Sequence, residues 1–187
     1  MAEEKKRRGR RDHLNDFYRD VSGNYVYTGV CYEHTGGVRA NTALLRRLRL
    51  MAAVMAAAVL AGGCISAPGV GRCFYVLLPY AAQIGVTGSV VWAVARWQVR
   101  EYPLREYIYR ATVQALPGRC LAQAVLAGVG LAAETLYLLL SGSDGHGAAA
   151  VIYLLLQACV LVLALLTRRA VLASDWQPEQ RGGLTTE

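Results

Sequence analysis

Residues 148–167 read AAAVIYLLLQACVLVLALLT, an uncharged apolar run that is followed at once by Arg168-Arg169. The hydrocarbon core of a bilayer is about 30 Å thick, so a helix needs about 20 apolar residues to cross it. This run has that length. It predicts a transmembrane helix that ends at the pair of arginines.

Three further apolar runs of spanning length precede this one, and the composition of the whole chain agrees with them. The chain has 187 residues, of which 55% are hydrophobic and 18% are charged, and its mean hydropathy is +0.28. Four such runs leave too little polar surface for a soluble domain of this size. We therefore expect an all-α integral membrane protein with four transmembrane helices in two hairpins, within a membrane domain of residues 41–167. The expected spans are 50–67, 73–95, 120–140 and 148–167.

The positions of lysine and arginine predict the orientation of the chain. Basic residues crowd the segment before the first run, the link between the second and third runs, and the tail after the fourth run. The link between the first two runs carries only Arg72, and the link 141–147 carries no basic residue. Because loops rich in lysine and arginine stay in the cytoplasm, we expect both termini and the middle link there. This orientation fits a plasma (inner) membrane, and the abundant alanine and glycine with short links favour a prokaryotic source.

The net charge of +7 is explained by topology and by attraction to an anionic inner leaflet, so the expected partner is the lipid bilayer and not nucleic acid. Much of this charge lies in a basic tail at residues 1–11, and residues 168–187 form a second cytoplasmic tail. Small residues at four-residue spacing, Ala124, Gly128 and Ala132, favour close helix packing. They are compatible with a compact bundle and with a homo-oligomer.

A tyrosine-rich segment falls within residues 12–40. Tyr25, Tyr27 and Tyr32 lie among β-forming residues, and Thr28-Gly29 is a candidate hairpin turn. An isolated two-stranded hairpin is only marginally stable in water. This segment must therefore pack against the membrane surface, the middle link or another protein. Two interpretations stay open: a docking site for a protein partner, and a packing element within the same chain.

The middle link predicts a short helix over residues 103–116. Pro103 suits the first turn of a helix, and Pro117-Gly118 suits its end. Tyr107 and Ile108 belong to its apolar face, which indicates a helix that lies in the inner membrane interface. It is either a coupling helix for a soluble partner or a solvated connector, and the docking hypothesis includes Tyr107 and Ile108 with the tyrosines above.

Glu134 is the one acidic residue inside an expected span, and ionisable residues at that depth usually face the bundle interior. It shares a helix face with Gln123. One interpretation is a proton or cation site to which neighbouring spans contribute further polar side chains. The other is an acid that is hydrogen-bonded across the helix packing. The candidate polar residues from the other spans are Gln83, Thr87 and Gln157.

Cysteine chemistry and enzyme motifs add little. Cys64 and Cys73 flank the first short link, and a disulfide between them is feasible in an oxidising compartment. The sequence contains no phosphate-binding loop, no His-Glu-x-x-His motif, no Cys-x-x-Cys pair and no serine elbow. We expect no catalytic residues, no metal site and no cofactor.

These patterns favour a small non-enzymatic membrane protein that serves as an accessory, assembly or interaction subunit. It would bind a protein partner or form a homo-oligomer. The alternative is a transporter or channel component that uses Glu134.

Overall fold

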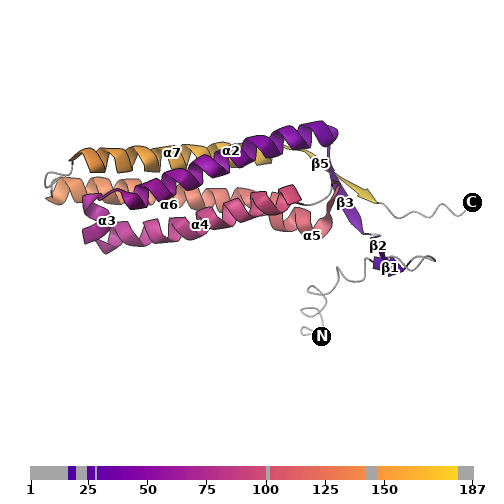
Figure 1. Ribbon diagram of the computed structural model, residues 1–187, viewed down its shortest axis with the longest axis horizontal. Helices are drawn as coiled ribbons and strands as arrows, with labels where there is room; N and C mark the ends of the chain where they lie inside the picture. Colours follow the sequence, from indigo (N-terminus) through magenta and orange to yellow (C-terminus); the bar gives the residue numbers. More distant parts are fainter. Residues whose placement is uncertain (1–16, 20–24, 28, 100–101, 142–146, 181–187) are drawn as a thin grey trace, which may run out of the picture.

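The structure is a computed structural model, and it describes residues 17–19, 25–27, 29–99, 102–141 and 147–180. Its main feature is a set of four long helices that lie side by side (Figure 1). The basic tail 1–11 and the last residues of the C-terminal tail lie outside the described residues. The long helices are α2 (Gly37–Cys64), α4 (Phe74–Val99), α6 (Leu116–Ser141) and α7 (Gly147–Leu172).

Each long helix packs against two others, so that α2 and α6 each contact both α4 and α7. The inner faces follow helical spacing: on α2 the buried residues include Leu48, Ala52, Met55 and Val59. A Cβ at Gly62 would make ordinary contact with the rings of Tyr80 and Tyr153, 3.8 Å away, whereas a Cβ at Gly63 would collide with the Tyr80 hydroxyl. Small residues thus allow close packing on this side of the bundle.

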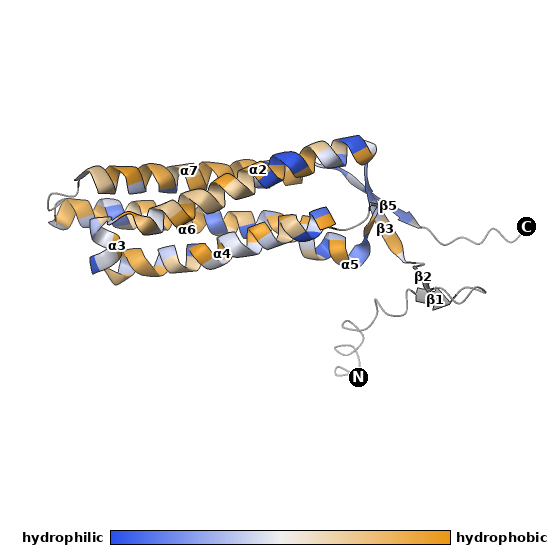
Figure 2. Cartoon of the chain, viewed as in Figure 1, coloured by the Kyte–Doolittle hydropathy of each residue, from blue (hydrophilic) through white to orange (hydrophobic). Residues whose placement is uncertain are grey.

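The outer surface of the bundle is apolar, which is the reverse of a soluble helical protein. Large hydrophobic side chains are widely exposed, among them Leu78 at 71% and Leu139 at 79%. Figure 2 shows this hydrophobic colour along α6 and α7 and on parts of α4, with hydrophilic residues gathered at the end of the bundle next to β3 and β5. Apolar surface on this scale is typical of a protein surrounded by lipid.

Three stretches of the described chain are long and apolar enough to cross a membrane. They are Phe74–Val99, Glu106–Ser141 and Gly147–Leu172, and they cover three of the four expected spans. α2 is not among them. Its first half carries four arginines and its second half is mostly alanine, so it is the least hydrophobic of the four long helices.

The link between α2 and α4 contains a short helix. This helix, α3 (Pro68–Arg72), begins with a proline in its first turn, where a missing N–H removes no helical hydrogen bond. The Cys73 N–H then donates to the Gly69 carbonyl at 2.9 Å, and α4 begins at the next residue. α3 contacts α6 as well as α4, so it covers one end of the bundle.

The middle link differs from the expected separate helix over residues 103–116. It consists of β4 (Leu104–Arg105), α5 (Glu106–Tyr109) and a π-helical turn, η2 (Arg110–Gln114), after which α6 begins at Leu116. The predicted helix end at Pro117-Gly118 is wrong, because both residues lie in the first turn of α6. Proline is tolerated there, so the same dipeptide suits a helix start as well as a helix end.

The tyrosine-rich segment also pairs differently from the prediction. β3 (Val30–His34) is the middle strand of an antiparallel sheet between β4 and β5 (Trp176–Gln180), with His34 opposite Trp176. β1 (Phe17–Arg19) and β2 (Tyr25–Tyr27) form a separate antiparallel pair. The predicted hairpin through Thr28-Gly29 is therefore wrong, since β2 and β3 do not pair. The longer ladder with β5 satisfies more backbone groups of β3 than a tight hairpin would.

Candidate functional site

The predicted polar residues of the spans all lie inside the bundle. Gln123 and Glu134 on α6 are fully buried, and their partners on the other helices are at most 5% exposed. Buried polar groups in an apolar surrounding are stable only when they are hydrogen-bonded, so their partners define the site. The residues on the other helices are Gln83 and Thr87 on α4 and Gln157 on α7.

Two glutamines from opposite corners of the bundle form a reciprocal amide pair. Gln83 Nε2 donates to Gln157 Oε1 at 2.9 Å, and Gln157 Nε2 donates to Gln83 Oε1 at 3.0 Å. Gln157 Nε2 also donates to the Tyr153 hydroxyl at 3.0 Å. Gly130 on α6 faces the Gln157 amide, and a Cβ at this glycine would lie 3.5 Å from its carbon. The pair joins α4 to α7 across the bundle.

A second interhelical contact continues this chain toward α6. Gln123 Nε2 donates to the Thr87 hydroxyl at 2.8 Å, and that hydroxyl donates to the main-chain carbonyl of Gln83 at 2.7 Å. Gln83 therefore links the amide pair to the threonine one turn further along α4. Hydrogen bonds between neutral groups thus join α7 to α4 and α4 to α6, and Gln83 takes part in both through its side chain and its main chain.

Glu134 lies apart from this series. Its Oε1 accepts a hydrogen bond from the Gly69 N–H of α3 at 3.3 Å. A side chain at Gly69 would collide with the carboxyl group, so α3 rests directly on Glu134. The predicted polar cluster thus separates into an amide series in the middle of the bundle and a carboxyl group under α3.

Two acceptor oxygens in these groups have no hydrogen-bond partner. They are Glu134 Oε2 and Gln123 Oε1, both in fully buried side chains. Such atoms can accept a hydrogen bond from water or contact a cation. Among the described residues no group of three or more His, Cys, Asp or Glu side chains is placed to hold a metal ion.

Sequence reasoning missed two tyrosines that belong to this core. The Tyr80 hydroxyl donates to the Val59 carbonyl of α2 at 2.8 Å, and its ring centroid lies 6.3 Å from that of Tyr153. Tyr80 precedes Gln83 by three residues and Tyr153 precedes Gln157 by four. The signal that could have found them is their helical spacing from the glutamines, which puts both tyrosines on the same inner face as the glutamines.

Aromatic side chains connect the sheet to the end of the bundle. Tyr32 of β3 stacks on Tyr109 with ring centroids 4.1 Å apart and ring planes 5° apart. Trp176 of β5 packs edge-on against Trp97 of α4 at 5.5 Å and against His34 at 5.4 Å. These contacts anchor both β3 and β5 to the helices. Trp97, Tyr109 and Trp176 were absent from the predicted site.

The predicted docking residues are thus brought together only in part. Tyr32 is used in the stack described above, Ile108 is 3% exposed, and Tyr107 packs against the core. These three residues fit the interpretation of a packing element within the chain. Tyr25 and Tyr27 lie in β2.

Arginines from three helices lie at this same end of the bundle. Arg119 of α6 donates to the Ser89 carbonyl of α4 at 3.0 Å. The guanidinium groups of Arg96 and Arg119 lie 5.0 and 5.7 Å from the ring centroid of Trp92. On α7, Thr167 precedes the arginine pair, and its hydroxyl oxygen lies 3.6 Å from the Met51 sulfur of α2.

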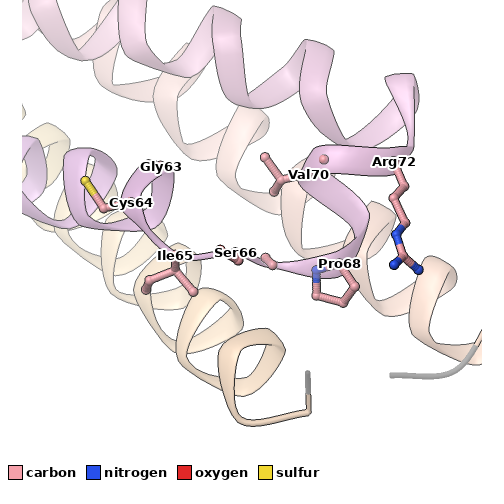
Figure 3. Close-up of a pocket in the computed structure, with 9 residues that line it drawn as sticks. Gly63, Cys64, Ile65, Ser66, Pro68, Val70 and Arg72 are labelled. Carbon is pink, nitrogen blue, oxygen red and sulfur yellow. The ribbon is translucent and has the colours of Figure 1, made fainter. Parts of the chain in front are cut away.

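The opposite end of the bundle holds the predicted cysteine pair. Cys64 is exposed and Cys73 is half-buried, and both are free thiols in this structure. A shallow pocket of about 450 Å³ lies between the end of α2 and α3. Figure 3 shows Cys64 at one side of this pocket and Arg72 at the other.

Comparison of the chain with protein-family models, with curated proteins and with solved structures finds no match. The function is therefore argued from the geometry described above.

Proposed function

We propose that this chain is a four-helix integral membrane protein that acts as a non-enzymatic accessory or assembly subunit in the plasma membrane of a prokaryotic cell. Its interior is held by paired polar side chains, and it contacts a protein partner through its cytoplasmic end. The observation that carries this proposal is the amide series of Gln83, Gln157, Thr87 and Gln123. Its donors and acceptors largely satisfy one another, as in a hydrogen-bond network that stabilises helix packing.

The pairing of β3 with β5 supports α2 as the fourth span. This pairing keeps the residues before α2 on the same side as the residues after α7. Three crossings by α4, α6 and α7 would leave the start of α4 on the opposite side. α2 joins these two sides, and at 28 residues it is about 42 Å long, enough to cross.

The arginines support a cytoplasmic location for the sheet end. Arg96, Arg119 and Arg168 lie where α4, α6 and α7 meet this end, and Arg49 is two residues from Met51, which contacts α7 there. A belt of arginines at one end of a bundle is typical of the cytoplasmic boundary.

The exposed edge of the sheet is the surface that we propose for a protein partner. β5 is an edge strand, and Gln177, Pro178 and Glu179 on it are exposed. An unpaired strand edge offers backbone donors and acceptors to a second chain. This edge differs from the surface of the sequence-based hypothesis, in which Ile108 is buried and Tyr32 and Tyr107 are half-buried.

The test is quantitative affinity purification in mild detergent, comparing the wild type with a Gln177→Arg/Glu179→Gln variant. The matched control is Gln98→Arg/Gln114→Arg, which adds the same charge at exposed helical positions. We expect a partner that co-purifies with the wild type and the control and is depleted with the β5 variant, while all three insert equally. Identical partner profiles for the three forms would overturn the docking surface.

Glu134 supports a second candidate, a transporter or channel component, because its Oε2 is buried and has no partner. A carboxyl oxygen that is free inside a bundle is able to exchange a proton or contact a cation. The test is proton or monovalent-cation flux in proteoliposomes of the wild type and Glu134→Gln. A flux that is lost in the variant, with folding unchanged, would favour this candidate over the accessory subunit.

A further inference from the structure

An open groove runs along the outer side of the first half of α2. It has a volume of about 1170 Å³, and all of its lining residues come from this one helix. Basic and apolar side chains share its walls: Val38, Arg39, Arg46, Arg47, Arg49 and Leu50.

The arginines of this groove carry positive charge that no described carboxylate neutralises. In the part of the chain that the structure describes, no carboxylate forms an ion pair with any of the four. Arg110, by contrast, pairs with Glu106 on α5. Guanidinium groups bind phosphate oxygens with two parallel hydrogen bonds, so several of them in one groove favour a phosphate-bearing ligand.

The apolar part of the groove indicates what else the ligand carries. Val38 is 60% exposed and Leu50 is 67% exposed. Beyond Arg49 the helix has no charged residue up to its end, and its outward side chains there include Ala53 and Val54. One side of α2 therefore changes at Arg49 from a basic surface to an apolar one.

This change occurs at the level expected for the membrane boundary. The contact between Met51 and Thr167 places Arg49 on α2 close to the level of Arg168 on α7. Leu50 then begins the apolar part on one helix, as the run that ends at Thr167 does on the other. A phosphate at the arginines would have its attached chains beside Leu50.

We propose that this groove binds an anionic glycerophospholipid of the membrane, with the phosphate held by Arg46 and Arg49 and an acyl chain lying along Leu50 and Ala53. The proposal rests on the membrane placement described under the proposed function, but it is independent of any protein partner. It specifies a lipid site on one helix, in place of a general attraction between a basic chain and an anionic leaflet.

The test is native mass spectrometry of the full chain in non-ionic detergent, incubated with phosphatidylglycerol, with phosphatidylcholine or with inorganic phosphate. An Arg46→Gln/Arg49→Gln variant removes two charges from the groove. Arg110→Gln/Arg169→Gln removes two exposed charges elsewhere and is the matched control. If the first variant fails to fold, Arg39→Gln/Arg47→Gln addresses the same groove.

We expect the wild type and the control to retain phosphatidylglycerol in preference to phosphatidylcholine. Binding to the groove variant should be about 25-fold weaker, since each arginine near an anionic lipid contributes about a factor of five. Equal retention by variant and control, or equal retention of the two lipids, would overturn the proposal. Inorganic phosphate that competes fully with the lipid would also overturn it. Because no partner is present, the lipid site and the docking surface succeed or fail separately.

Discussion

Breaking the reciprocal amide pair should destabilise the bundle by an amount that the structure allows us to estimate. Gln83→Leu removes two hydrogen bonds to Gln157, and Gln157→Leu removes these two and the one to Tyr153. Interhelical hydrogen bonds in membrane proteins contribute about 0.6 kcal/mol on average and at most about 1.7 kcal/mol. We therefore expect losses of about 1–2 kcal/mol for Gln83→Leu and about 2 kcal/mol for Gln157→Leu.

The double variant distinguishes paired amides from two separate buried glutamines. Each single change leaves a buried amide without its partner, whereas the double change removes both amides. The free energy lost by the double variant should therefore be about 1 kcal/mol smaller than the sum of the two single losses.

The assay is unfolding of the purified chain by sodium dodecyl sulfate in mixed micelles, followed by circular dichroism. Gln98→Leu is the matched control, because this glutamine is exposed and its replacement should change stability by less than about 0.5 kcal/mol. If the loss of unfolding free energy in the double variant equals the sum of the losses in Gln83→Leu and Gln157→Leu, the two amides are not paired.

Two further substitutions test the ends of the bundle by thermal unfolding in detergent. Gly69→Ala should cost about 1–3 kcal/mol, because a Cβ there collides with the Glu134 carboxyl, whereas Gly71→Ala meets open space and should be neutral or slightly stabilising. Equal effects of the two changes would count against the contact between α3 and α6. Trp176→Ala should cost about 1–3 kcal/mol, because it removes the aromatic packing of β5 on α4, and Gln177→Ala on the same strand should cost little. A stable Trp176→Ala variant would show that the sheet is not anchored to the bundle.

Periodicity in the sequence predicted the parts of this structure that depend on local pattern. The apolar run 148–167 lies within α7, and the polar face of α6 that carries Gln123 and Glu134 is buried, as its spacing indicates. Helical spacing determines which side chains share a face. It does not determine the rotation of one helix against another, so the pairing of Gln83 with Gln157 could not be derived.

The sheet depends on contacts between residues far apart in the chain. β3 and β5 are separated by the entire helical bundle, and Trp176 lies in a stretch that the composition describes only as a tail. No short-range pattern specifies such a pairing. The predicted helix end at Pro117-Gly118 was wrong for another reason. Proline suits both the first turn of a helix and the residues after a helix, and only the continuation into α6 decides between the two.

The central claim is that α2 crosses the membrane with its first residue on the cytoplasmic side. Single cysteines at Thr35, before α2, and at Ser66, after it, test this directly, in a chain whose five native cysteines are replaced by serine. Intact spheroplasts are treated with a membrane-impermeant maleimide before and after permeabilisation. We expect Ser66→Cys to be labelled from outside and Thr35→Cys to be labelled only after permeabilisation. Labelling of both positions from the same side would contradict the proposal of four spans.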